Sequence, residues 1–150
     1  MTKPEPPVGR DMSRWLGDGG MPLLGALGLS FEDYGIEDDD EAGFATATWV
    51  PTVLCCNPHG VVQAGVHAIV LDAAMNFALN AGLAKGASAR ATLEMKVETM
   101  RAAAGGAPLS VRAAVVREAR QIAFVEGRTE DAECRLVSRA TGTFLIARPQ

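Results

Sequence analysis

The chain has 150 residues, which is enough for one ordinary domain and too few for two full ones. Apolar residues make up 48% and charged residues 21%, a balance that indicates a real core and excludes a disordered, collagen-like or coiled-coil chain. Because the net charge is -4, we expect no nucleic acid and no membrane as a partner.

The N-terminal segment is predicted to be a tail. Residues 1–10 hold three of the eight prolines and lack the apolar run of a secretory signal. The three cysteines, at positions 55, 56 and 134, have neither disulfide nor zinc spacing. We therefore expect a reduced, cytoplasmic protein without metal or cofactor, in which residues 1–20 form a tail with a short helix at 11–16, and residues 21–150 form one domain.

The first half of that domain is predicted to contain little regular structure besides two strands. A short helix at 21–29 leads into a strand at 29–34, where apolar and polar residues alternate. An acidic turn at 37–41 follows. Residues 44–50, FATATWV, are rich in β-branched and aromatic residues and predict a strand that ends at Pro51. Residues 53–62 contain Pro58 and Gly60 and predict a structured loop.

A single long helix is predicted at residues 64–81, with apolar residues around its whole circumference. Its length would suit a membrane span, but His67, Asp72, Asn76 and Asn80 would be costly in hydrocarbon. We therefore expect a buried helix that is covered on nearly all sides.

The rest of the chain is predicted to form strands at 91–99, 109–118, 121–128 and 135–147. In the first of these, Leu93, Met95 and Val97 alternate with charged residues, which predicts one dry and one wet face. The connections are too short for parallel crossovers. The expected fold is α+β, a curved antiparallel sheet wrapped around the helix. Since one such sheet cannot easily cover a helix, we expect dimerisation that extends the sheet.

A candidate site lies where the loop enters this helix. A helix N-terminus offers unpaired backbone N–H groups that can hold an oxyanion, and the small residues Ala64 and Gly65 would let a carbonyl approach them. Asp72 lies about two turns further along, and Asn76 and Asn80 continue its row. The alternative is that Asp72 is a structural residue bonded to backbone groups.

The sequence gives less support for a functional role of the other titratable residues nearby. His67 lies on an apolar helix, where a histidine is more often a satisfied core residue than a ligand. Cys55, Cys56, His59 and His67 have neither the spacing of a metal site nor a third residue to orient a nucleophilic pair.

Four stretches resemble a known family. They are NPHGVVQAG with Asp72 after it, ATLEMKV, GAPLSVRAAVVR and RLVSRATGTFLI. Together they resemble the hotdog-fold acyl-CoA thioesterases of the phenylacetate-degradation type, in the 4-hydroxybenzoyl-CoA thioesterase superfamily. That family has the pattern Asn-x-x-Gly-x-x-His-Gly-Gly, with an acidic residue fifteen positions after the Asn, and Asn57 and Asp72 have that spacing.

The resemblance implies roles for four residues. Asp72 matches the acid that acts as nucleophile or general base, and Asn57 matches the residue that orients the water or the thioester carbonyl. Ala64 takes the place of the first Gly of the triplet and would supply its N–H to the oxyanion hole. Thr92 resembles the Ser or Thr that supports the acid.

One position departs from the family. Gln63 stands where the family has histidine, and a glutamine can hold a hydrogen bond but cannot take up a proton. We expect Gln63 to position groups in the site, with activity retained but reduced or redirected. The residues expected to contact the substrate are Gly65, His59, Gly60, Asn76 and Met75.

The predicted function is therefore hydrolysis of acyl-CoA or a related thioester by a homodimer, often paired into a dimer of dimers as in the family. Three alternatives stay open. One is a hotdog protein that binds acyl-CoA without turnover, favoured by Gln63 and Ala64. Another is a hydratase or dehydratase, for which no paired His and acid is evident. The last is a purely structural oligomerisation domain.

Overall fold

The computed structural model describes residues 9–37 and 41–150. The predictions for most of the proline-rich tail, at 1–8, and for the middle of the acidic turn, at 38–40, lie outside the described residues.

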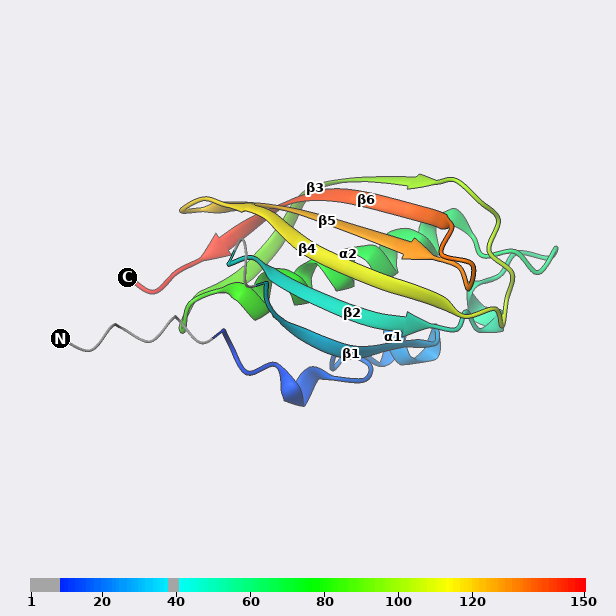
Figure 1. Ribbon diagram of the computed structural model, residues 1–150, viewed down its shortest axis with the longest axis horizontal. Helices are drawn as coiled ribbons and strands as arrows, with labels where there is room; N and C mark the ends of the chain where they lie inside the picture. Colours follow the sequence, from blue (N-terminus) through cyan, green and yellow to red (C-terminus); the bar gives the residue numbers. More distant parts are fainter. Residues whose placement is uncertain (1–8, 38–40) are drawn as a thin grey trace.

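The described chain folds into one sheet and one long helix (Figure 1). The six strands have the order β1-β2-β4-β5-β6-β3, and every neighbouring pair is antiparallel. This confirms the predicted α+β arrangement. In chain order the elements are η1 (Ser13–Trp15), α1 (Pro22–Ala26), β1 (Leu29–Ile36), β2 (Gly43–Trp49), η2 (Val53–Cys55), α2 (Ala64–Gly82), β3 (Ser88–Thr99), β4 (Leu109–Glu118), β5 (Ile122–Glu130) and β6 (Leu136–Ala147).

The predicted element types hold, and the short elements are shorter than expected. The predicted helix at 11–16 is only the 3₁₀ turn η1, and the one at 21–29 is the five-residue α1. The N-terminal segment packs onto the domain, since Met12 is 5% exposed and belongs to the core. The predicted loop at 53–62 contains one 3₁₀ turn, η2.

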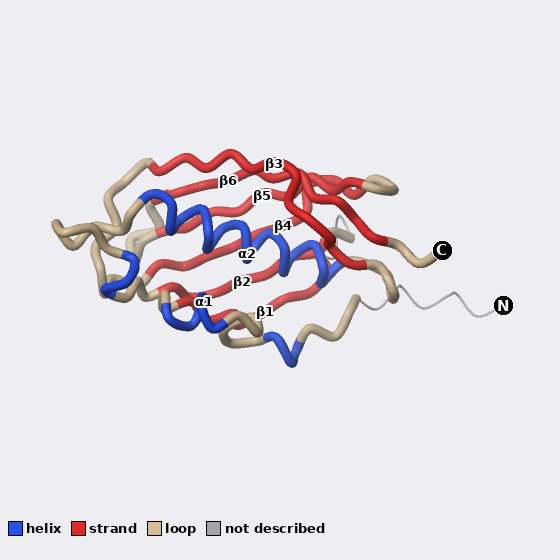
Figure 2. Tube along the Cα trace, turned by 180° about the vertical axis from the view of Figure 1, so that it is seen from behind, coloured by secondary structure: helices blue, strands red, loops and turns tan. Residues whose placement is uncertain are grey.

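The core lies between α2 and the concave face of the sheet (Figure 2). Met75, at the middle of the helix, is fully buried and lies over Gly127 of β5 and Gly142 of β6. A Cβ at Gly142 would come within 3.2 Å of the Met75 Cε. Glycines on the two neighbouring strands therefore let the helix approach the sheet closely.

A buried polar chain ties the first turns of α2 to the sheet. The His67 Nδ1 lies 2.9 Å from the Ser138 Oγ, which lies 2.6 Å from the Thr129 Oγ1. The ring of Trp49 meets the His67 ring edge-on, with centroids 5.2 Å apart. All four side chains are buried. The hydrogen bonds of this polar chain satisfy His67, Ser138 and Thr129, and the Trp49 Nε1 donates instead to the Leu27 carbonyl at 2.9 Å. His67 is thus a satisfied core histidine.

The two edges of the sheet differ. Along β1, Gly17 pairs with Phe31 through two backbone hydrogen bonds of 3.0 and 2.7 Å, so the N-terminal segment covers part of that edge. In the described chain, β3 pairs only with β6, and its other edge is unpaired. The predicted dry face of β3 was wrong at Leu93, which is 55% exposed. Bulges on both sides of Thr92 and the position of β3 at the rim of the sheet explain this exposure.

One side of α2 stays open within the single chain. Ile69 is 38% exposed, and Asp72 and Asn76 on the same side are partly exposed. The expectation of cover on nearly all sides is therefore wrong for one copy of the chain. By length and composition α2 could cross a membrane, yet half of it is buried by the sheet, as in the core helix of a globular domain.

We predict that His67 makes stability pH-dependent. Burial lowers its pKa from the usual 6.5, so the folded state favours the neutral ring. As pH falls below about 6.5 the unfolded state binds the proton first, and stability falls by at most about 1.4 kcal/mol per pH unit until the folded-state pKa is reached. Urea unfolding of wild type and His67→Gln between pH 8 and 5 should show the wild-type advantage shrinking as pH falls. A constant difference would contradict this.

Candidate functional site

The loop before α2 is built by Asn57. Its Oδ1 accepts hydrogen bonds from the backbone N–H groups of His59, at 2.9 Å, and Val61, at 3.2 Å. Its backbone N–H donates to the Val61 carbonyl at 2.8 Å. Gly60 has φ +75°, a conformation that glycine adopts without strain. The Asn57 Oδ1 thus holds the turn. The role in orienting water or the thioester carbonyl that the resemblance implies for Asn57 stays a prediction.

A distant segment fixes this loop in place, which sequence reasoning missed. The Val62 N–H donates to the Ala103 carbonyl at 2.9 Å, and the Gly105 N–H donates to the Gly60 carbonyl at 3.0 Å. A Cβ on Gly105 would come within 2.8 Å of the Cys56 Sγ. The only signal in the sequence is a run of small residues at 102–107.

The helix entrance is open to a ligand. Gln63 is the N-cap residue, and its exposed side chain makes no capping hydrogen bond. Ala64 and Gly65 lie in the first turn, where backbone N–H groups have no partner within the helix. Both are exposed, and nothing lies within 4 Å of a Cβ built on Gly65. These N–H groups can therefore meet an incoming carbonyl oxygen.

Asp72 lies on the open side of α2 with one specific partner. The Thr92 Oγ1 on β3 donates a 2.7 Å hydrogen bond to the Asp72 Oδ1. The predicted pairing of these two residues is therefore present in the structure. The hydrogen bond fixes one carboxylate oxygen, and the partly exposed position of the side chain keeps the group in reach of a ligand.

The two asparagines further along the helix and Met75 have other contacts. The Asn80 Nδ2 donates to the Asn76 Oδ1 at 2.9 Å, and the Asn80 Oδ1 accepts from the Ala89 N–H at 2.9 Å. Asn80 thereby connects α2 to the start of β3. Asn76 stays on the open side as a candidate contact. Met75, predicted to touch substrate, is not brought to that side, because its side chain fills the core beneath the sheet.

The helix entrance and the carboxylate are far apart in one chain. Ala64 and Asp72 are eight residues apart on the same helix, which places them about 12 Å apart along its axis. Reacting groups must come within about 3.5 Å of each other. One copy of the chain therefore cannot bring its own Asp72 to a carbonyl held at its own helix entrance.

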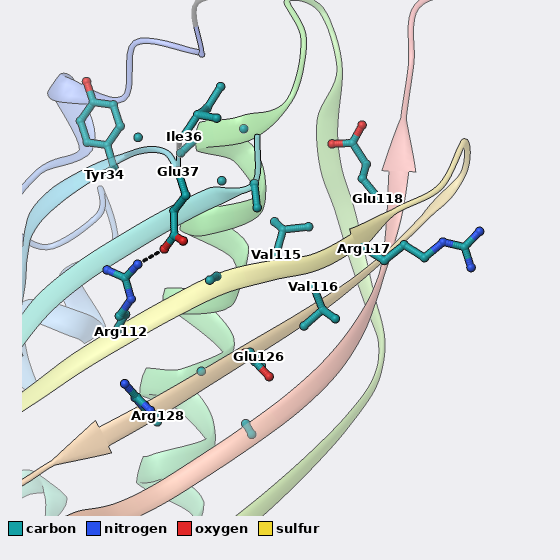
Figure 3. Close-up of a pocket in the computed structure, with 18 of the residues that line it drawn as sticks. Tyr34, Ile36, Glu37, Arg112, Val115, Val116, Arg117, Glu118, Glu126 and Arg128 are labelled. Atoms are coloured by element: carbon teal, nitrogen blue, oxygen red, sulfur yellow. Dashed lines mark hydrogen bonds and ion pairs between the residues drawn. The ribbon is translucent and has the colours of Figure 1, made fainter. Parts of the chain in front are cut away.

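A broad open groove of about 1780 Å³ lies elsewhere, and residues from the outer face of the sheet and from the C-terminal end of α2 line it (Figure 3). Glu37 and Arg112 form an ion pair across it. Arg128 and Glu126 also line it, so its charges are mixed. None of the predicted site residues lines this groove.

Within residues 9–37 and 41–150, no group of three or more His, Cys, Asp or Glu side chains is placed to hold a metal ion. All three cysteines are free, with Cys55 buried, Cys56 partly buried and Cys134 exposed.

Solved structures resemble this fold closely. A Ralstonia eutropha protein assigned as a thioesterase and related to phenylacetic acid degradation is 29% identical, with a TM-score of 0.75 over 91% of this chain and 99% of that one. The Escherichia coli PaaI protein of the phenylacetic acid degradation operon is 22% identical, with a TM-score of 0.67 over 87% of this chain and 86% of its own. A Streptococcus pneumoniae protein assigned as a thioesterase and solved with coenzyme A is 17% identical, with a TM-score of 0.69 over 81% and 88%.

The fold is therefore the hotdog fold, a curved antiparallel sheet around one central helix, and the solved structures it matches include thioesterases. No family model matches the chain, and no curated protein matches it. At 17% and 22% identity, the S. pneumoniae and E. coli proteins show a likeness of fold alone. The Ralstonia protein is more similar in sequence, at 29% identity.

We predict that Asn57 holds the site loop through its Oδ1. Asn57→Ala removes the acceptor of the His59 and Val61 amides, each worth about 1 kcal/mol, so hydrogen exchange at these amides should speed up by about fivefold. Asn57→Asp keeps an acceptor oxygen and is the matched control. Exchange followed by NMR tests this, and unchanged protection in Asn57→Ala would show that the turn stands without the side chain.

Proposed function

We propose that the protein is an acyl-CoA thioesterase, which hydrolyses a thioester to a carboxylic acid and free CoA. The observation that carries the proposal is the Asp72 carboxylate, held by Thr92 at 2.7 Å on the open side of a hotdog central helix. The likeness to solved thioesterases supports the reaction class. The S. pneumoniae protein solved with coenzyme A supports CoA as the thiol.

In the proposed reaction, backbone N–H groups stabilise the oxyanion and the Asp72 carboxylate activates the attacking group. The thioester carbonyl oxygen lies at the N–H groups of Ala64 and Gly65, which stabilise its developing negative charge. As general base, Asp72 takes a proton from water while the water oxygen bonds to the carbonyl carbon. The C–S bond then breaks, and the leaving thiolate takes up that proton. As nucleophile, an Asp72 oxygen would instead bond to the carbonyl carbon while the C–S bond breaks and the CoA thiolate leaves. Water would then hydrolyse the resulting anhydride to the free acid and the Asp72 carboxylate, and the thiolate would take up the proton that is released.

The proposal requires two copies of the chain. The separation of about 12 Å between helix entrance and carboxylate is too long for one copy, but two antiparallel α2 helices place each entrance beside the partner's Asp72. The unpaired edge of β3 and the exposed Leu93 support pairing at this side. We propose a homodimer, paired further into a dimer of dimers, working in the cytoplasm.

Gln63 is the residue that favours a second candidate function, acyl-CoA binding without turnover. The Gln63 side chain at the helix entrance is an amide, so it cannot act as a general acid or base. This side chain is exposed and makes no capping hydrogen bond. In the thioesterase it positions the carbonyl or the loop, and the carboxylate carries the proton transfer. Without turnover, the same site would be a receptor for acyl-CoA. The measurement that separates the two is thiol release against stoichiometric binding.

We predict that Asp72→Asn, which keeps the shape and removes the charge, lowers turnover at least about a hundredfold. Free thiol release from a panel of short, long and aromatic acyl-CoA substrates is the measurement. Asp33→Asn, an exposed position on β1, is the matched control and should keep full activity.

Two outcomes would contradict the proposed thioesterase activity or the role of Asp72 in it. Equal turnover by wild type and Asp72→Asn would show that the Asp72 carboxylate takes no part in the reaction. No thiol release by wild type, with acyl-CoA bound at one molecule per site, would establish the binding protein in its place.

A further inference from the structure

The polar chain of His67, Ser138 and Thr129 is the one polar group in the described core. Of the residues that the structure describes, these three are the buried polar ones, and they are hydrogen-bonded to one another. Apolar side chains of the same shape would avoid the desolvation of three polar groups. We therefore looked for a role of the polar chain beyond packing.

The polar chain lies beneath the helix entrance. His67 belongs to the first turn of α2 and is the first buried residue of that helix. Thr129 on β5 and Ser138 on β6 are partners in the strand register, so their hydroxyl groups meet in front of the His67 ring. The Gln63 side chain makes no capping bond, and Gly65 has no side chain. His67 is thus the side chain that ties the first turn of α2 to β5 and β6.

The order of the hydrogens in the polar chain follows from Thr129. Its hydroxyl is fully buried, and the Ser138 Oγ at 2.6 Å is the acceptor that the described residues offer it. Thr129 therefore donates to Ser138, while its own Oγ1 accepts from the Ser138 N–H at 3.1 Å. The Ser138 hydroxyl then donates to the His67 Nδ1 at 2.9 Å. The neutral ring accordingly carries its hydrogen on Nε2.

Proton uptake by His67 would break this order. A protonated Nδ1 must donate to the Ser138 Oγ, and the Ser138 hydrogen can then turn only toward Thr129. One hydroxyl hydrogen of the polar chain is left without an acceptor in a buried place, which is costly. Burial also opposes the charged ring directly and lowers the pKa of His67.

No neighbouring charge offsets this cost. The buried positions of the described strands, which face α2, hold no Asp, Glu, Lys or Arg. On α2 itself, Asp72 lies on the open side, away from the sheet. The Trp49 ring packs against His67, and the Trp49 Nε1 and the Cys55 Sγ both donate to the Leu27 carbonyl. A protonated His67 would therefore be an unpaired positive charge in the core.

We propose that neutral His67 is a positioning residue for the helix entrance, and that proton uptake by its ring releases the first turn of α2 from β5 and β6. The Ala64 and Gly65 N–H groups then hold a carbonyl oxygen only while His67 is neutral. This inference rests on the proposed function in one respect, that the carbonyl belongs to a thioester. The site becomes sensitive to acid through a residue that touches no substrate.

The first test is NMR spectroscopy of the His67 ring. His59→Gln removes the only other histidine, so that the ring signals belong to His67. Two-bond ¹H–¹⁵N spectra at pH 8 should show a hydrogen on Nε2 and none on Nδ1. Acid should protonate Nδ1 below the usual 6.5, because burial lowers the pKa of His67. A hydrogen on Nδ1 at pH 8 would reverse the order of the polar chain and overturn the proposal.

The second test is hydrogen exchange along α2. Helix geometry bonds the Ala68 N–H to the Ala64 carbonyl, and the Ala81 N–H near the other end to the Phe77 carbonyl. As the His67 ring becomes protonated, protection of Ala68 should fall about fivefold relative to Ala81. His67→Gln cannot take up a proton and is the matched control, with no such change expected. Equal loss at both ends of α2, or a ring that stays neutral until the domain unfolds, overturns the proposal.

The third test separates the hydroxyl of Thr129 from its packing. Thr129→Val keeps the shape and removes the donor to Ser138, whereas Thr129→Ser keeps the hydroxyl and removes a methyl group. Thr129→Val should lower kcat for octanoyl-CoA about tenfold, because a small misplacement of reacting groups slows a reaction by this order, and Thr129→Ser should keep it. Both should bind S-octyl-CoA, a thioether without a carbonyl, as wild type does. The reverse order of the two variants, or a tenfold loss of thioether binding in Thr129→Val, overturns the proposal.

Turnover as a function of pH distinguishes this inference from the proposed function. The ratio of wild-type to His67→Gln kcat should fall about tenfold as the His67 ring is protonated, and the titration of Asp72 cancels in this ratio. If no thioester is hydrolysed but the ring order and the selective loss of protection at Ala68 are found, the proposed reaction fails and the positioning role stands. If thiol is released and the ratio stays constant over pH, the reaction stands and the positioning role fails.

Discussion

The need to cover one apolar helix with one sheet governs this structure. The concave sheet buries the side of α2 that carries Met75 and His67, where glycines on β5 and β6 allow close approach and a polar chain satisfies the histidine. The sheet ends at β3 before it can close over the other side. The candidate catalytic residue Asp72 and the exposed edge of β3 both belong to the side that is left open.

The open side is the basis for the proposal that the site is shared by two copies of the chain. A helix presents its N–H donors only at its N-terminus, whereas Asp72 stands two turns further along. Within one copy these two functions are separated by about 12 Å.

Much of this could be predicted from the sequence, because local periodicity decides it. The apolar run at 64–81 and the alternation at 29–34 and 91–99 predicted the α+β arrangement. The family resemblance, carried by the spacing of Asn57 and Asp72, predicted the hotdog fold and the candidate site. The rest depends on contacts distant in sequence. Leu93 alternates as a buried residue does, but bulges and the sheet edge expose it. Gly105 holds the site loop across forty-five positions, and no local pattern indicates that contact.

The central claim is that each site uses Asp72 of one copy and the helix entrance of the other. Asp72→Asn can be mixed with Gly65→Leu, which obstructs the entrance at a position with open space around it. Each variant alone should be inactive. Subunits refolded together in equal amounts should recover about a quarter of wild-type thiol release, because half of the dimers are mixed and each has one intact site. If the mixture stays as inactive as its parents, each site lies within one chain and the account is wrong.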